Sequence, residues 1–232
     1  MDTNSTSIGS INESSLHKEL KLHYAKKGFI PEEKVLGFVV DLKKDDKIIE
    51  IQTGNFSSLR KKLNLLLPEH QICVVYPIAL EKWIVRLSEE GEVLSKRRSP
   101  KKGEYAQVFN ELVYLTDLLL HPHLMLELVL INEEEIRLED GKGSWRRKGV
   151  SIKDHNLLEI KEKQRLTTVN DYLSFLPKDL PEVFTNKDIS AGSNYPINLT
   201  RKMTYTLKNM QLIEIIGKRQ RERLYQISGG GN

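Results

Sequence analysis

The chain has 232 residues and a mass of 26.8 kDa, enough for one ordinary domain and a second, small one. Its 39% hydrophobic and 29% charged residues are typical of a soluble globular protein, and no apolar run approaches the roughly 20 residues that span a bilayer. The net charge of +4 permits a polyanionic partner, while the single cysteine, Cys73, excludes an internal disulfide and favours the reducing cytoplasm.

The N-terminal region is predicted to be a disordered segment followed by a helix. Residues 1–15 are rich in Ser, Thr and Asn, and they lack the basic start and apolar stretch of a signal peptide. A helix is predicted over residues 15–27, with Ser14 or Ser15 as its N-cap and a glycine as its stop. Glu19 lies at the edge of the apolar face of this helix.

An apolar hairpin follows. Two strands are predicted over residues 35–42 and 48–53, joined by a tight polar turn over residues 44–47. If the turn is centred between residues 45 and 46, the antiparallel register places Asp41 opposite Glu50. The hairpin therefore brings two acidic side chains together from its two strands.

This acidic pair lies within apolar surroundings. Side chains alternate along a strand, so Gln52 is predicted on the same face as Glu50. Directly opposite residues have Cβ atoms roughly 4.5–5.5 Å apart, and two carboxylates at that spacing repel each other unless a cation lies between them. The apolar neighbours leave no solvent face, which favours a metal site. The alternative is a surface hairpin with an acidic pair on its solvent face.

The elements around the hairpin form a familiar order. A helix is predicted over residues 56–67 and a continuous apolar strand over residues 71–79. Helix, hairpin, helix and strand, with Asp41 and the Glu50-Ile51-Gln52 run, resemble the PD-(D/E)xK, or restriction-endonuclease-like, nucleases. The resemblance implies an α/β fold in which a mixed sheet is flanked by helices.

The resemblance also implies a metal centre and a reaction. Asp41 and Glu50, with the backbone carbonyl of Ile51, are expected to hold Mg²⁺, with Mn²⁺ as an alternative, for phosphodiester hydrolysis. An acidic residue on the first helix supports the metal in this family, and Glu19 is the candidate.

The chain departs from the family motif at one position. Gln52 stands where most members have a lysine, although a minority of active members have glutamine there. Glutamine can form a hydrogen bond to the attacking water but carries no positive charge. Lys43, on the same face as Asp41, is the candidate to supply that charge.

The remainder of the first domain, which is predicted to span residues 16–166, contains further strands and one helix. The predicted elements are a hairpin over residues 81–94, a helix over 104–120, a hairpin joining 124–131 to 135–138, and a strand or connector over 157–166.

Two basic loops accompany these elements. The first follows the hairpin and is either a phosphate-binding arm or an ordinary solvated loop. The second contains Trp145, which either stacks on nucleic acid or is a buried anchor for the loop. The residues predicted to bind nucleic acid here are Arg97, Arg98, Lys101, Lys102, Arg146 and Arg147.

From residue 167 the pattern changes. The predicted elements are a helix over residues 169–176, a helix over 186–190 capped by Thr185, a longer helix from Pro196 to about residue 210, and two strands joined by a basic turn over 217–222. Together they resemble a winged helix-turn-helix domain, a small α+β unit assigned to residues 167–228. Residues 229–232 are predicted to be a flexible tail.

The resemblance to winged helices implies contact with DNA. The third helix is expected to enter the major groove, and the strand pair to reach phosphate or the minor groove. The predicted contact residues are Arg201, Tyr205, Lys218, Arg219, Arg221 and Arg223. The alternative is a protein-binding module, because many winged helices contact proteins instead.

Together these features predict a cytoplasmic, metal-dependent DNA endonuclease that does not associate with a membrane. The alternative function is a non-catalytic DNA-binding regulator built on a decayed nuclease core. The surviving Asp41 and Glu50 argue against decay, and the missing lysine argues for it. The sequence leaves open whether the protein forms a homodimer.

Overall fold

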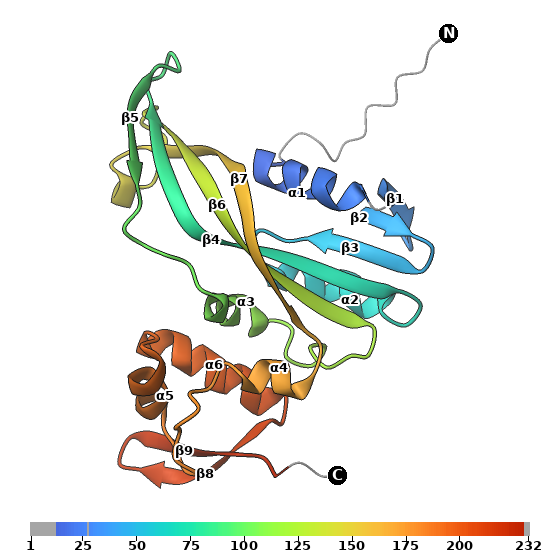
Figure 1. Cartoon of the computed structure of the whole chain (residues 1–232), viewed down its shortest axis with the longest axis vertical. Coiled ribbons are helices and arrows are strands. Elements are labelled where there is room, and N and C mark those ends of the chain that lie inside the picture. The colour runs from blue at the N-terminus through green and yellow to red at the C-terminus, as the bar shows by residue number, and fades with distance from the viewer. Residues whose placement is uncertain (1–12, 27, 230–232) are drawn as a thin grey trace.

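The computed structural model describes residues 13–26 and 28–229. A long, twisted sheet with a helix on each face forms the upper body, and a smaller helical unit with a strand pair lies below it (Figure 1). The predicted α/β class with a mixed, helix-flanked sheet is confirmed at this level. Residues 1–12 of the predicted disordered segment 1–15, and residues 230–232 of the predicted tail 229–232, fall outside the described residues. The predicted disorder does not extend to residues 13–15, because Ser14 caps α1 and Ser15 begins it.

The sheet has seven strands in the order β1-β2-β3-β4-β6-β7, with β5 paired to the far end of β4. β3, β4 and β6 run parallel, and the other pairs are antiparallel. The strands are β1 (Ile30–Val35), β2 (Phe38–Lys44), β3 (Lys47–Ile51), β4 (Gln71–Leu87), β5 (Val93–Arg98), β6 (Leu124–Leu138) and β7 (Ser151–Leu166).

Two helices cover opposite faces of this sheet. α1 (Ser15–Ala25) packs Leu20 and Tyr24 against strand residues such as Val75 on one face. α2 (Leu59–Leu66), preceded by a 3₁₀ turn at Phe56–Ser58, packs its leucines on the other face. None of the helices within the described ranges has the length and apolar character needed to cross a membrane.

The hairpin predicted over residues 81–94 is confirmed, because the end of β4 pairs antiparallel with β5. The break predicted between residues 79 and 81 and the hairpin predicted to join 124–131 to 135–138 are absent, because β4 and β6 are each continuous there. β4 runs for 17 residues and β6 for 15, through the charged positions that the sequence pattern indicated as breaks. Lys82 of β4 lies 2.9 Å from Glu133 and 2.8 Å from Glu135 of β6, so the charges compensate each other across strands. Because each charged side chain finds its partner on the neighbouring strand, the charged positions can stay within the sheet and neither strand has to end in a solvent-exposed turn there.

The predicted helix over residues 104–120 is also wrong. A 3₁₀ turn at Tyr105–Val108 leads into the four-residue helix α3 (Phe109–Leu112), and successive turns follow. Leu115 and Leu119 are nevertheless buried. The turns place the same leucines in the core that a regular helix would, so the apolar spacing did not distinguish the two backbones.

The C-terminal unit contains three helices and a strand pair. They are α4 (Val169–Leu173), α5 (Asn186–Ser193), α6 (Ile197–Asn209), β8 (Ile213–Arg219) and β9 (Glu222–Ile227). Thr185 forms a capping box with Asp188 at the start of α5, as its predicted capping role requires. The turn between the strands is shorter than predicted, because β8 extends to Arg219 and β9 begins at Glu222.

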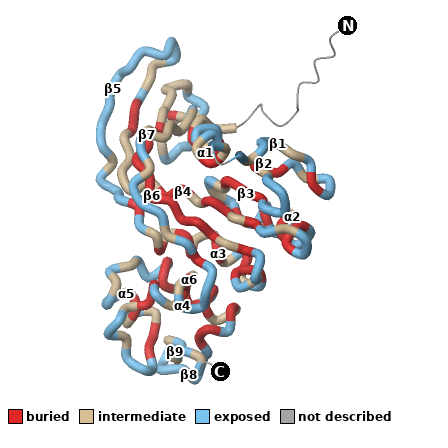
Figure 2. The backbone as a smooth tube through the Cα atoms, turned by 45° about the vertical axis from the view of Figure 1, so that its right-hand side comes forward, coloured by how far each residue is buried: buried red, intermediate tan, exposed pale blue. Residues whose placement is uncertain are grey.

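One hydrophobic core joins the two parts of the molecule. The rings of Phe109, in α3, and Phe175, after α4, pack edge to face with their centres 5.2 Å apart. The Tyr172 hydroxyl donates to the Leu119 carbonyl at 3.1 Å, and Lys202 of α6 donates to a side chain of α3. Figure 2 shows buried backbone continuing across this junction. The two predicted domains therefore share a core.

Candidate metal centre and nucleic-acid interface

The acidic pair lies where β2 and β3 separate. The register of the hairpin is the predicted one, with Leu42 opposite Ile49. Beyond this pair, the Ile51 N–H donates to Oδ2 of Asp41 at 2.8 Å, and the Asp41 backbone donates to the Glu50 carboxylate. Each acid therefore binds the backbone of the opposite strand. The two acids therefore lie together at the carboxyl end of β3.

Asp41 is held by a histidine of α1. Nε2 of His17 lies 3.2 Å from Oδ2 of Asp41 and 2.9 Å from the Ile51 carbonyl oxygen, while Nδ1 contacts the Glu13 carboxylate. Ser14 caps α1 by accepting from the His17 N–H, which places His17 in the first turn. Glu13, His17 and Asp41 each offer a ligand atom within 4.8 Å of the others.

The charges in this group shift one another. Burial alone would raise the pKa of the Asp41 carboxyl, but the hydrogen bond and charge of His17 outweigh burial and hold that pKa below its usual value. Burial would lower the pKa of His17, but Asp41 and Glu13 outweigh it and raise that pKa. These shifts favour a protonated His17 between the ionised carboxylates of Asp41 and Glu13.

Glu50 is held by a lysine of α2. Nζ of Lys62 lies 2.6 Å from each Glu50 carboxylate oxygen and donates to the Val39 carbonyl at 2.6 Å. Burial raises the pKa of the Glu50 carboxyl to about 7, although the charge of Lys62 opposes this effect. This places the ionisation of Glu50 near neutral pH.

The structure does not bring Gln52 and Lys43 into contact with the acidic pair. The Gln52 amide donates to the carbonyls of Gly54 and Asn55, so this side chain folds onto the turn after β3. Lys43 instead forms an ion pair with Glu33 of β1 at 3.1 Å. The lysine beside the acids is therefore Lys62 of α2.

Glu19 lies away from this group. Its carboxylate accepts from the Leu157 N–H of β7 at 2.6 Å and so fastens α1 to the edge of the sheet. The residues that the sequence analysis missed are Glu13, His17 and Lys62. The helical spacing of His17 and Lys21, which share a partner in Glu13, was a signal that could have indicated this face of α1.

The donor set fits a divalent cation. The Nε2 atom of His17 occupies the point on which Oδ2 of Asp41 and the Ile51 carbonyl oxygen converge, and these are two of the three predicted ligands. Carboxylate and carbonyl oxygens suit Mg²⁺ and Mn²⁺, and an imidazole nitrogen adds a preference for the transition metal.

A second acidic group lies farther along the sheet. Glu133, Glu135 and His155 also lie within ligand distance of one another. Lys82 and Arg137 already pair with these carboxylates, at distances between 2.5 and 2.9 Å. Because the acids are neutralised by two cations, this group functions as a buried ion-pair network between strands.

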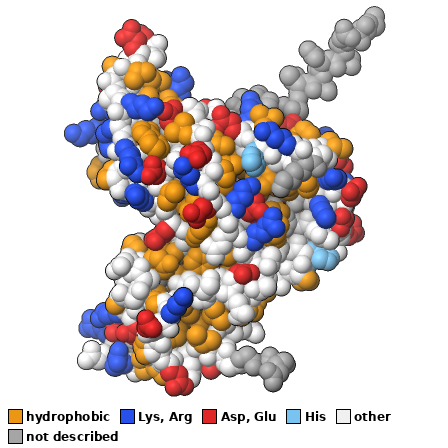
Figure 3. All heavy atoms as spheres, viewed as in Figure 1, with side chains coloured by type: hydrophobic (Ala, Val, Ile, Leu, Met, Phe, Trp, Pro, Cys, Tyr) orange, Lys and Arg blue, Asp and Glu red, His pale blue; other side chains and the backbone are white. Residues whose placement is uncertain are grey.

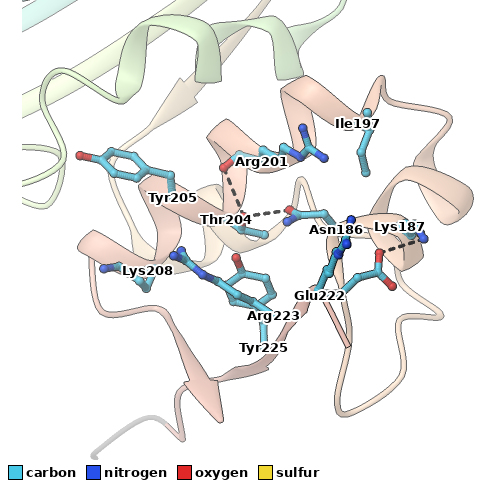
Figure 4. Close-up of a pocket in the computed structure, with 11 residues that line it drawn as sticks. Asn186, Lys187, Ile197, Arg201, Thr204, Tyr205, Lys208, Glu222, Arg223 and Tyr225 are labelled. Atoms are coloured by element: carbon cyan, nitrogen blue, oxygen red, sulfur yellow. Dashed lines mark hydrogen bonds and ion pairs between the residues drawn. The ribbon is translucent and has the colours of Figure 1, made fainter. Parts of the chain in front are cut away.

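The C-terminal unit has a basic hollow between α6 and the strand pair. Arg201, Tyr205 and Lys208 of α6 line it together with Arg221 and Arg223. Figure 4 shows Arg201, Tyr205, Lys208 and Arg223 around the opening. Arg201 and Tyr205 are exposed, as predicted from the spacing of α6.

Lys218 and Arg219 lie outside the lining of this hollow. Both are exposed at the tip of the strand pair. They remain available to a partner beside the hollow.

The basic loops of the sheet lie at the far end of β4 and β6. Arg97, Lys101 and Lys102 line one hollow there, and Arg146 and Arg147 line a neighbouring one. Arg97 and Arg137 belong to both hollows.

Arg98 and Trp145 lie outside the lining of both hollows. Arg98 pairs with Glu81 and stacks over Trp83. Trp145 is 83% exposed, so it is not the buried anchor that was one of the two predicted alternatives.

Comparisons with known proteins show relatives for most of the chain. Residues 14–167 match the model of a family described as a domain of unknown function, DUF8091. An uncharacterized protein of Treponema pallidum (strain Nichols) is 36% identical over 184 residues, which are 79% of this chain and 73% of that protein. No solved structure gives a significant match.

Proposed function

The chain belongs to the DUF8091 family, and we propose that it is a divalent-metal-dependent endonuclease of the PD-(D/E)xK type that hydrolyses phosphodiester bonds in DNA. The observation that carries the proposal is the convergence of the Asp41 carboxylate and the Ile51 carbonyl on one cation position, beside the Glu50–Lys62 pair.

The arrangement of the elements supports this assignment. Asp41 lies on β2 and Glu50 on β3, β3 runs parallel to β4, and α1 and α2 cover the two faces. This is the order of elements that the nuclease family uses to build its site. Glu50 is 4% exposed, and burying a carboxylate beside Asp41 carries a desolvation cost that a bound metal ion would offset.

The metal would be held by oxygen and nitrogen donors of this chain. Asp41, Glu50 and the Ile51 carbonyl would provide oxygens, and His17 and Glu13 would complete the set from α1. When bound, Mn²⁺ or Mg²⁺ would lower the pKa of a water ligand and stabilise negative charge on the phosphate.

Lys62 takes the role that the motif gives to a lysine. Its ammonium lies beside Glu50, where it places a positive charge next to the site although Gln52 has none. Because Lys62 also donates to the Val39 carbonyl, its position is fixed by two partners. A charge held in this way stabilises a phosphate that enters the site without rearrangement of the side chain.

The C-terminal unit is proposed to be a winged helix that binds the duplex. Arg201 and Tyr205 of α6 would face the major groove, and the exposed Lys and Arg side chains of the strand pair would contact phosphates. Within residues 13–26 and 28–229, Lys218, Arg219 and Arg221 form no ion pair, so their charge is available to DNA. A cytoplasmic location, inferred from the single cysteine, belongs to this proposal.

One observation favours the alternative of a non-catalytic DNA-binding regulator. Gln52 replaces the motif lysine, and its amide is occupied by backbone carbonyls. In that case the acidic pair would be a remnant that His17 and Lys62 neutralise.

Plasmid nicking in Mn²⁺ and in Mg²⁺ tests the proposal. We expect the wild type to nick supercoiled DNA and Asp41→Asn and Glu50→Gln to lose this activity. Glu19→Gln is the matched control, because its carboxylate binds β7 and not the site, and it should keep the activity. Absence of cleavage by the wild type with both metals, on duplex, branched and single-stranded DNA, would leave the regulator as the function.

A further inference from the structure

The far end of the sheet carries a basic groove formed by two neighbouring hollows. Arg97 of β5 and Arg137 of β6 line both hollows, so the two are continuous. Nine basic and two acidic residues line them in total. The segments that contribute are distant in sequence, and Figure 1 shows β5 and the loop after β6 side by side. We call this surface the distal groove.

The acids of the distal groove are already neutralised. Glu135 pairs with Lys82 at 2.8 Å and with Arg137 at 2.5 Å, and Glu139 pairs with Arg86. In contrast, six Lys and Arg side chains of the groove form no ion pair with any residue that the structure describes. They are Arg97, Lys101, Lys102, Arg146, Arg147 and Lys148. This uncompensated charge fits a polyanion.

An aromatic ring lies beside this charge. Trp145 is 83% exposed, on a 3₁₀ turn at Trp145–Arg147. The loop that carries it is well fixed, since the Gly143 N–H donates to the Gly149 carbonyl at 2.7 Å and Arg147 Nε donates to the Val150 carbonyl at 3.1 Å. A rigid loop that presents a largely exposed indole to solvent is typical of a stacking platform.

We propose that the distal groove binds single-stranded nucleic acid. The phosphates would contact the Lys and Arg side chains that have no ion-pair partner, and an unpaired nucleobase would stack on Trp145. The phosphates of a duplex could contact the basic side chains, but its nucleobases could not stack on Trp145, because paired and stacked bases offer no free face to an exposed ring. The Arg146 guanidinium, 5.5 Å from the centre of the indole ring, would extend the stacking surface.

The groove is well separated from the proposed metal centre. Glu50 pairs with Val74 of β4 and Arg97 pairs with Ile84 of the same strand. Val74 and Ile84 are ten positions apart on β4, a path of roughly 33 Å along the strand at about 3.3 Å per residue. The inference therefore adds a second surface to the proposed nuclease, and the implied substrate class is a duplex with a single-stranded tail.

Anisotropy of a labelled 12-mer of thymidylate, measured with the full chain in EDTA, tests the inference. We expect Trp145→Ala to weaken binding roughly 5- to 150-fold and Trp145→Phe to retain most of the affinity. Arg97→Gln should weaken binding and reduce the salt slope by about 0.7. Arg98→Gln is the matched control, because this neighbour lies outside the groove and already has an acidic partner, and it should bind like the wild type.

Two further arms separate the outcomes. A uridylate 12-mer tests RNA against DNA, and Trp145-dependent binding of either strand supports the inference. Equal affinity for a blunt 12-base-pair duplex, or wild-type binding by both Trp145→Ala and Arg97→Gln, would overturn it. Asp41→Asn should bind the oligomer normally, so a failure of the proposed metal centre is distinguishable from a failure of the distal groove.

Discussion

At the scale of single residues, the candidate site depends on two cations that hold two acids from opposite sides. His17 approaches Asp41 from α1, and Lys62 approaches Glu50 from α2. Both pairs are largely shielded from water, so each acid has a different ionisation from a free carboxylate. The substitutions of greatest interest are therefore those that alter one member of a pair.

Lys62 should matter more to cleavage than Gln52. Lys62→Gln removes the charge beside Glu50 and should lower the rate of plasmid nicking by about 10²–10³, the scale of losing one positioned electrostatic partner. Gln52→Ala should change the rate less than tenfold, because the amide faces the Gly54 and Asn55 carbonyls. Single-turnover rates measure both, and the reverse ranking would return the motif role to Gln52.

Stability should fall with pH because of Glu50. Burial raises its folded pKa to about 7 from 4.5, so the native state holds a proton that the unfolded state has lost. The free energy of unfolding should therefore decrease as the pH rises from 4.5 to 7, by on the order of 3 kcal/mol at 1.36 kcal/mol per pKa unit. Glu50→Gln mimics the protonated acid and should lack this decrease.

Urea titrations of both proteins across that pH range isolate the effect. The raised pKa of His17 is caused by Asp41 and Glu13, which both proteins retain. Parallel curves for the two proteins would show that the Glu50 carboxyl ionises normally in the folded state.

At the scale of elements, the position of α1 decides whether His17 reaches Asp41. Asp154 of β7 accepts hydrogen bonds from the Ser15 N–H at 2.9 Å and from its hydroxyl at 2.5 Å. Glu19 accepts from the Leu157 N–H one turn later. The start of the helix is thus tied to the edge strand β7, although the residues it serves lie on β2 and β3.

Asp154→Ala should loosen this attachment. Loss of two hydrogen bonds to a charged acceptor should destabilise the fold by about 1–3 kcal/mol. It should also weaken Mn²⁺ binding in calorimetry, since His17 is less firmly placed. Asp117→Ala provides the control, because this acid makes an exposed pair with Arg60, and neither quantity should change there by much. Unchanged Mn²⁺ affinity in Asp154→Ala would show that α1 is positioned by its apolar face alone.

At the scale of the whole molecule, the sheet and the C-terminal unit form one packed body. The apolar cluster runs from the sheet through α3 to α6 (Figure 3 shows apolar side chains at the junction). The surface proposed to bind DNA is therefore held in a fixed relation to the proposed metal centre, with no flexible linker between them.

Phe175→Ala tests this coupling. Removing a buried aromatic ring should cost about 3–5 kcal/mol, and the loss should appear in a single unfolding transition of the whole chain. Thermal unfolding followed by calorimetry and by circular dichroism distinguishes a single transition from two separate ones. Separate transitions, with only the smaller one shifted, would mean that the two parts fold independently.

The strand pair of the C-terminal unit should contact phosphates of the duplex. Arg219→Ala combined with Arg221→Ala should reduce the salt slope of duplex binding by roughly two, since each phosphate contact contributes about 0.9. Fluorescence anisotropy over a salt series measures the slope. Point substitutions are preferable to deletion here, because deletion would expose the shared core. A slope equal to that of the wild type would place this strand pair away from the DNA backbone.

The sequence by itself determined the local features of this protein. Alternation of apolar side chains and a polar turn were enough for the register of the hairpin that brings Asp41 and Glu50 together. The caps Ser14 and Thr185 marked where α1 and α5 begin. These features depend on neighbours along the chain, so a periodic pattern or a capping side chain reveals them directly.

Only the tertiary structure decided which distant side chains meet. Charged positions in β4 and β6 indicated turns, yet each strand continues because Lys82 finds its partners on the adjacent strand. His17 and Lys62 reach the acids because two helices dock on opposite faces of one sheet. Packing between elements fixes these contacts, and the local pattern of a sequence contains no record of a partner 12 to 53 residues away.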